Sequence, residues 1–115
     1  MTSIVETLIE TATADTDLLV KNAELGDNAS VSRNVDFLFY ADSKKTADLV
    51  ASFVTDFRYG SPSVKKAEKR FQLTVTIATP TTQEALLCIS GFMACIAFIY
   101  ELEYDGWESD VCMGG

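Results

Sequence analysis

The sequence predicts an α+β fold: a ferredoxin-like split βαβ domain, with a four-stranded antiparallel sheet and two helices on one face, preceded by an N-terminal helical arm. Three observations predict it. Val35–Ala41 and Phe71–Ile77 alternate apolar and polar residues as half-buried strands do, each is followed by a helical pattern, and a last alternating stretch begins at Tyr100. We expect residues 1–30 to form the arm and residues 31–112 the ferredoxin-like domain.

The N-terminal arm is expected to be helical. Apolar residues recur at helical spacing over Ser3–Ala12 and again over Asp17–Leu25. The polar stretch Thr13–Thr16 between them allows either an interruption or one continuous helix. Gly26 follows the last periodic residue and suits a C-cap, because glycine readily adopts the left-handed conformation that ends many helices.

The first strand and helix of the domain come next. Val35–Ala41 predicts a strand with one well-defined apolar face. The Asp42 side chain can accept a hydrogen bond from the first turn of the following helix and is its expected N-cap. The amphipathic stripe of that helix consists of Leu49, Val50, Phe53, Val54 and Phe57.

The middle of the domain is expected to form two strands joined by a basic turn. Arg58–Glu68 contains Gly60 and Pro62, which restrict it to an edge strand. Phe71–Ile77 alternates cleanly, and Pro80 ends this strand. We interpret the charges of the turn as protection of a sheet edge, with contact to a partner as the alternative. These basic residues are Lys65, Lys66, Lys69 and Arg70.

The last helix is unusually apolar. Thr81 and Glu84 have the spacing of a capping box, and Ala85–Tyr100 contains no charged residue. A bilayer span needs about 20 apolar residues, so this shorter run predicts a buried helix rather than a membrane segment. Such a helix must be covered on more than one side, by the sheet and by a second helix or another subunit.

The final strand alternates apolar and acidic residues. Tyr100, Leu102 and Tyr104 are expected to face the core, and the acidic residues between them to face outward. Trp107, the only tryptophan, follows an Asp-Gly pair and is expected either as an exposed interface anchor or as a half-buried core residue. The open face of the sheet is expected to display Asp36, Leu38, Tyr40, Gln72, Thr74, Thr76, Glu101, Glu103 and Asp105.

Charge and cysteine content limit the classes of function. The 115 residues carry a formal net charge of −8, with acids concentrated in residues 1–30 and 81–115 and bases in residues 61–80. Proteins that bind nucleic acid or anionic membranes depend on clustered Lys and Arg, so neither partner is expected. The three cysteines form no C-x-x-C pair and no secretory signal is present, which predicts reduced, buried thiols and a cytoplasmic location.

The sequence contains few of the groups that catalysis requires. It has no histidine, which removes the commonest general base and most zinc sites, and no Gly-rich phosphate loop. We therefore expect no enzyme activity and no cofactor. The alternative is a Ca²⁺, Mg²⁺ or acid-base site formed by Glu101, Glu103 and Asp36, because carboxylate oxygens suit these ions. An open acidic face, solvated or partner-binding, is favoured over it.

Two segments of the chain resemble a known family. Ser32–Asp42, which reads Ser-Arg-Asn-Val-Asp-Phe-Leu-Phe-Tyr-Ala-Asp before a helix, is similar to the opening of the regulator of ribonuclease activity B family, as is Leu25–Asp27 ahead of Arg33. Glu103–Glu108, which reads Glu-Tyr-Asp-Gly-Trp-Glu, resembles the closing motif of that family and is the more specific signal. The resemblance covers most of the chain and implies a ferredoxin-like domain.

The resemblance also implies a function. Characterised relatives are non-enzymatic inhibitors that bind the non-catalytic scaffold region of ribonuclease E and modulate RNA degradation. The alternative is a homodimeric ferredoxin-like domain with another protein or small-molecule partner, suggested by the apolar surface of the last helix and of Leu38 and Tyr40. The partner-binding residues that we expect are Asp36, Tyr40, Glu101, Glu103, Asp105 and Trp107.

Overall fold

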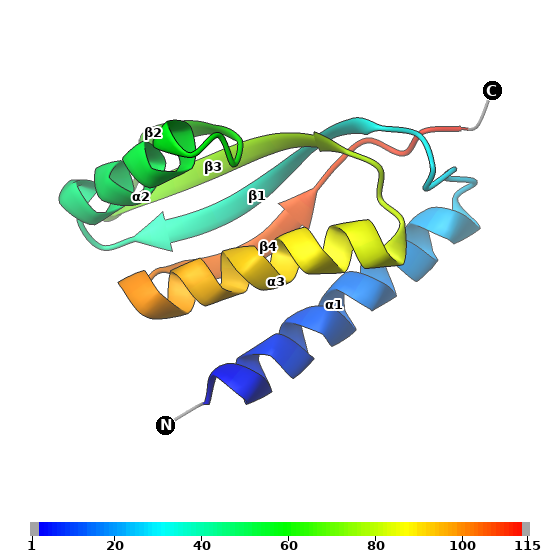
Figure 1. Cartoon of the computed structure of the whole chain (residues 1–115), viewed down its shortest axis with the longest axis horizontal. Coiled ribbons are helices and arrows are strands. Elements are labelled where there is room, and N and C mark those ends of the chain that lie inside the picture. The colour runs from blue at the N-terminus through cyan, green and yellow to red at the C-terminus, as the bar shows by residue number, and fades with distance from the viewer. Residues whose placement is uncertain (1–2, 114–115) are drawn as a thin grey trace.

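The described part of the computed structural model, residues 3–113, forms three helices and one four-stranded sheet. In chain order the elements are α1 (Ile4–Glu24), β1 (Arg33–Ala41), α2 (Lys44–Asp56), β2 (Ser61–Ala67), β3 (Arg70–Thr79), α3 (Gln83–Tyr100) and β4 (Glu103–Glu108). The strands are antiparallel and lie in the order β2-β3-β1-β4 (Figure 1). This order, with a helix in each of the two crossovers, confirms the predicted split βαβ fold.

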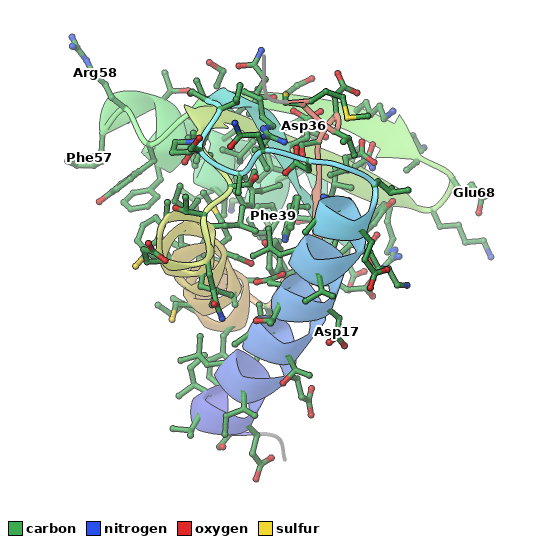
Figure 2. The ribbon with its side chains drawn as sticks, turned by 90° about the vertical axis from the view of Figure 1, so that its right-hand side faces the viewer. Asp17, Asp36, Phe39, Phe57, Arg58 and Glu68 are labelled. Carbon is green, nitrogen blue, oxygen red and sulfur yellow. The ribbon has the colours of Figure 1, made fainter. Side chains whose placement is uncertain are left out.

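One face of the sheet packs against α2 and α3 and forms the core. Alternate residues of the two central strands point into this layer, and Phe37, Phe39, Leu73 and Val75 are completely buried there. Figure 2 shows Phe39 between the sheet and the helices, and Asp36 on the opposite side of the sheet. The alternation that predicted the strands therefore also predicted which side chains build the core.

The apolar helix α3 is covered from two directions, as expected. One side packs on β4 and β1, and α1 runs along another side (Figure 1). The packing leaves room for a side chain at Gly91, because an added Cβ there would lie 3.9 Å from the Leu8 side chain of α1, an ordinary contact distance. By length and composition α3 could cross a membrane, but core helices share these properties. Because α1 joins the helical layer, the outer face of the sheet stays open.

The helix α1 is continuous, so the interruption considered for Thr13–Thr16 is absent. The Thr13 hydroxyl is satisfied within the helix by donating to the Ile9 carbonyl at 2.9 Å. Gly26 ends the helix as predicted. Its φ is +93°, and its N–H donates to the Ala23 carbonyl at 3.0 Å, as in a Schellman motif.

Both predicted N-caps of the later helices are wrong. Ser43, rather than Asp42, caps α2 by accepting a hydrogen bond from the first turn at 3.2 Å. Thr82 precedes α3 without a side-chain capping bond, so Thr81 and Glu84 form no capping box. The Thr81 side chain is buried and bonds elsewhere, which is why it is unavailable to the helix.

The strand β4 begins later than predicted. Tyr100 is the last residue of α3, and Glu101 adopts the left-handed conformation, with φ +59°, that ends the helix. Neither residue lies on the strand, so their predicted place in the sheet is wrong, although Tyr100 packs against the core and Glu101 is exposed as expected. The apolar helical run continues through Tyr100, so the helix takes the first residue of the predicted strand. The strand itself begins only at Glu103.

A β-bulge reverses the side-chain direction near the end of β4. Two residues, Asp105 and Gly106, lie opposite the single residue Leu38 of β1, and Gly106 has a φ of +83°. Without the extra residue, the alternation would turn Trp107 outward. With it, Trp107 lies opposite Phe37 and joins the core. The Asp-Gly-Trp sequence is therefore a structural requirement of this strand.

A buried ion pair anchors the start of β1. The Arg33 guanidinium binds the Asp27 carboxylate, and the two side chains are 5% and 3% exposed. Burying a charge is costly unless every polar atom finds a partner. Arg33 meets this condition by donating to the carbonyl of Asn28 at 2.7 Å and to the carbonyl of Val31 at 3.0 and 3.1 Å.

The same ion pair holds two further segments. The Asp110 carbonyl accepts from Arg33 at 3.1 Å, and the Asp27 carboxylate accepts from the Cys112 backbone N–H at 2.7 Å and the Thr81 hydroxyl at 3.4 Å. Burial by itself would raise the pKa of Asp27, but the Cys112 N–H and the Arg33 guanidinium outweigh it and hold that pKa below its usual value. The end of α1, the start of β1, the approach to α3 and the C-terminal segment thus meet at one point.

Replacing Gly106 by alanine is expected to destabilise the protein by about 1 kcal/mol, because an L residue is strained at a left-handed φ. The site is otherwise open, since an added Cβ would meet nothing within 4 Å. Gly91→Ala is the matched control, because it lies within α3 and alanine favours a helix there. Urea unfolding measures both variants, and a Gly106→Ala protein as stable as Gly91→Ala would contradict the bulge.

Replacing Arg33 by methionine is expected to cost about 3 kcal/mol, because the Asp27 charge stays buried without its partner. The double variant Asp27→Asn, Arg33→Met should recover part of this loss. The pKa of Asp27 is lowered in the folded protein. Its charge therefore stabilises the fold fully at pH values above 3.8, the ordinary pKa of an aspartate, and this stabilisation disappears as the pH falls through the lowered pKa. Urea unfolding at neutral and acidic pH tests both effects. A double variant less stable than Arg33→Met would refute the first, and a wild-type advantage that does not shrink at acidic pH would refute the second.

Candidate functional site

Three of the predicted partner-binding residues border one cleft at an end of the sheet. Tyr40 of β1, Glu101 at the end of α3 and Glu103 of β4 line a cleft of about 410 Å³. They meet because β1 ends where β4 begins, which places Tyr40 opposite Glu103. Glu101 reaches the cleft from the helix end rather than from the strand.

Arg70 also lines this cleft, although sequence reasoning had placed it only in the basic turn. Its guanidinium lies 4.5 Å from the centre of the Tyr40 ring and donates to Glu103 Oε1 at 3.0 Å. Gln72 Nε2 donates to the Tyr40 hydroxyl at 3.2 Å. The signal that could have found Arg70 is the strand register, because Gln72 lies opposite Tyr40. An exposed ion pair adds little stability, but the Arg70 cation also lies within cation–π distance of the Tyr40 ring.

Asp36 and Asp105 lie elsewhere, so the predicted residues do not converge on a single pocket. The Asp36 carboxylate accepts from the Thr76 hydroxyl at 2.6 Å and borders a second cleft of about 340 Å³ together with Glu108. Asp105 is at the bulge and borders a third cleft beside α1. The arrangement is an extended surface rather than a reaction centre.

Five exposed acids near the C-terminal end form a row that we call the acidic margin. They follow β4, an edge strand paired only with β1, from the end of α3 into the C-terminal segment. Residues 81–115 contain no basic residue, so no lysine or arginine from this part of the chain interrupts the row. The acidic margin consists of Glu101, Glu103, Asp105, Glu108 and Asp110.

The opposite edge of the sheet carries the basic residues. β2 is the other edge strand, and it contains Lys65 and Lys66 and leads through Glu68 and Lys69 to β3. Figure 2 shows Glu68 at the tip of this hairpin, far from α1. The prediction that β2 is an edge strand is confirmed. The strand order therefore converts the uneven charge of the sequence into two edges of opposite sign.

Trp107 is buried, so the exposed-anchor alternative is wrong. The residue is 6% exposed, and its indole N–H donates to Asp15 Oδ1 at 3.0 Å. A buried indole needs such an acceptor, and here the acceptor comes from α1. Trp107 thus ties β4 to α1 and fixes the strand that carries the acidic margin.

Asp15 is a buried carboxylate that sequence reasoning did not single out. It is 4% exposed, and its Oδ2 has no hydrogen-bond partner among the described residues. Burial raises the pKa of Asp15, against the opposing effect of Ser90 and Trp107. Beside it the Tyr104 hydroxyl bonds Ser90 Oγ at 2.7 Å, and burial raises the pKa of Tyr104 as well. The available signal was helical spacing, because Asp15 lies one turn before Leu19, which packs against the core.

The described residues contain no arrangement typical of a metal centre. Within residues 3–113, no group of three or more His, Cys, Asp or Glu side chains is placed to hold an ion. All three cysteines are free, and Cys88 is exposed, which corrects the expectation that the thiols are buried. The surface offers charges and hydrogen bonds for binding rather than an activated nucleophile.

The comparison with protein families shows to which family this chain belongs. The model of the family described as regulator of ribonuclease activity B matches residues 12–109. The chain belongs to this family. Members of the regulator of ribonuclease activity B family are non-enzymatic regulators of ribonuclease E activity, so the predicted family, regulatory role and non-enzymatic character are confirmed. A search of the curated proteins found no match.

The region matched to the regulator of ribonuclease activity B family includes the contacts that organise the site. Asp15 and Trp107 both lie within residues 12–109, as do Asp27 and Arg33. Four of the five residues of the acidic margin also lie within it, and Asp110 follows directly. The surface and its support thus belong to one matched unit.

Replacing Asp15 by asparagine is expected to change how stability depends on pH. Because the pKa of Asp15 is raised in the folded protein, its contribution is fully present below the ordinary value of 3.8 and is lost as the pH rises through the raised pKa. The asparagine side chain keeps an oxygen for the Trp107 indole and does not titrate. Wild type should therefore lose stability relative to Asp15→Asn as the pH rises to 7. Urea unfolding followed by Trp107 fluorescence measures this difference, and a constant gap would refute the raised pKa.

Proposed function

We propose that this chain regulates RNA degradation in the cytoplasm by binding the non-catalytic scaffold region of ribonuclease E through its acidic margin. The observation that carries the proposal is that the fold of a ribonuclease E regulator places five exposed acids, the acidic margin, along the edge strand β4 and its two ends. The acidic margin calls for a basic docking segment on the partner, because opposite charges on the two surfaces speed association and select among partners. A net charge of −8 extends this attraction beyond the contact itself.

The predicted site residues have different parts in this proposal. Glu101, Glu103 and Asp105 meet the partner directly, because all three are exposed, and Glu103 does so while paired with Arg70. Asp36 and Tyr40 extend the contact from the acidic margin onto the open face of the sheet. Tyr40 is held by Arg70 and Gln72, so it loses little conformational freedom on binding.

Trp107 contributes to binding indirectly. Its buried indole is held by Asp15 and cannot act as a surface anchor. By filling the core beneath the bulge, it fixes the direction in which Asp105 and Glu108 project. It is a positioning residue for the acidic margin.

Reversing charge at the acidic margin is expected to weaken ribonuclease E binding by about tenfold, because attraction to a basic segment becomes repulsion. The variant is Glu101→Lys, Glu103→Lys, and the measurement is the affinity for the isolated scaffold region of ribonuclease E at low and moderate salt. Asp56→Lys, Glu68→Lys makes the same change in net charge at two exposed positions of α2 and the β2–β3 turn. Equal weakening by both variants would indicate a net-charge effect and refute the acidic margin as the docking surface.

The homodimer remains the alternative prediction. Its strongest support is apolar surface at the end of α3, where Phe98 is 46% and Ile99 71% exposed. The rest of α3 exposes less apolar surface than its sequence suggests, because α1 covers one side of the helix. Leu38 and Tyr40 are half-buried on the open face. Family membership favours the regulator, so we rank the homodimer second.

A further inference from the structure

A cleft between α1 and the bulge of β4 opens onto the acidic margin. It has a volume of about 250 Å³, and Glu10 and Asp105 on its border are exposed whereas Asp15 is buried. The bulge leaves the side next to Gly106 open, because an added Cβ there would meet nothing within 4 Å. The lining includes Glu10, Thr11, Asp15, Tyr104, Asp105 and Gly106.

One oxygen of Asp15 lacks a donor in this cleft. Oδ1 accepts from the Trp107 indole, but Oδ2 is buried and has no hydrogen-bond partner among the described residues. The neighbouring Ser90 hydroxyl bonds Tyr104 at 2.7 Å, where either hydroxyl can be the donor, and it lowers the pKa of Asp15 without making a hydrogen bond to Oδ2. A buried acceptor without a donor is costly, so a ligand that brings a donor gains more here than on an open surface.

The charges around the cleft specify the kind of donor. Glu10 faces it from α1 and Asp105 from β4, Tyr104 and the Ser90 hydroxyl beside Asp15 are uncharged, and no basic residue is among the lining residues. A cationic donor is therefore favoured over a neutral one. Because the cation stabilises the ionised carboxylate, binding should tighten as the pH rises and release a proton to the buffer.

We propose that this cleft binds the guanidinium group of an arginine side chain supplied by the protein partner, with Asp15 Oδ2 as its buried acceptor. The identity of the partner rests on the proposed function, whereas the cleft does not. A guanidinium is planar, carries five N–H donors and stays charged at every relevant pH. It can donate to Asp15 while facing Glu10 and Asp105 at the border, with its flat face available to the Tyr104 ring.

Titration of the protein with Nα-acetyl-arginine amide tests the cleft without any partner. The single indole N–H signal of Trp107 is the reporter, because this group donates to Asp15. We expect a saturable shift of that signal in wild type and about tenfold weaker binding in Asp15→Asn, which loses a charge-assisted hydrogen bond. Asp17→Asn is the matched control: it removes the same charge from an exposed position two residues along α1, pointing away from the sheet in Figure 2.

Two outcomes of this titration would overturn the proposal. One is a shift of the indole signal that does not saturate, or that is equal in wild type and Asp15→Asn. This result is expected if Asp15 is protonated and donates a hydrogen bond to Ser90 instead of accepting one from the ligand. The other is equally strong binding of the lysine analogue, Nα-acetyl-lysine amide, which would show that the cleft does not select a guanidinium.

Binding of the ribonuclease E scaffold region separates this proposal from the proposed function. We expect Asp15→Asn to bind it about tenfold more weakly than Asp17→Asn does, through loss of the same hydrogen bond. If the scaffold region binds both variants equally, insertion of its arginine into the cleft is refuted and the proposed function stands. If the arginine amide binds wild type but the scaffold region does not, the cleft stands and the proposed function fails.

Discussion

The buried ion pair between Asp27 and Arg33 is the constraint on which the rest of the structure depends. Two charges can leave water only if their remaining hydrogen-bonding groups are satisfied, and here the partners come from distant parts of the chain. Meeting that requirement fixes the end of α1 against β1 and brings the C-terminal segment alongside. Without it, the end of α1 and the segment after β4 would lose the contacts that hold them beside β1.

The second fixed point is the bulge at Gly106. It turns Trp107 into the core, where Asp15 receives its indole N–H, and so joins β4 to α1 near the middle of the helix. The ion pair and the bulge together hold α1 at two places. The segments that carry the family resemblance are therefore largely structural: Asp27 and Arg33 belong to the first fixed point, and Gly106 and Trp107 to the second. Binding is left to the exposed acids between and beside them.

Several elements could be predicted from the sequence because their cause is local. The alternation in β1 and β3 follows from burial of one face, Gly26 ends α1 because its conformation requires it, and Pro62 confines β2 to an edge. The errors arose where tertiary contacts competed with local patterns. Thr81 bonds Asp27 instead of capping α3, and the bulge breaks the alternation from which the direction of Trp107 would have been inferred.

The candidate site shows the same division. The sequence by itself determined the fold class, the family and the excess of acids near both ends, because each depends on residue type and spacing along the chain. Only the tertiary structure decided that Arg70 reaches Glu103, that Trp107 is buried, and that Asp15 lies in a cleft where its Oδ2 meets no donor from the described residues. The physical reason is that hydrogen bonds and desolvation depend on distances between segments, and no local pattern records which buried oxygen will lack a donor once the helices and the sheet have packed.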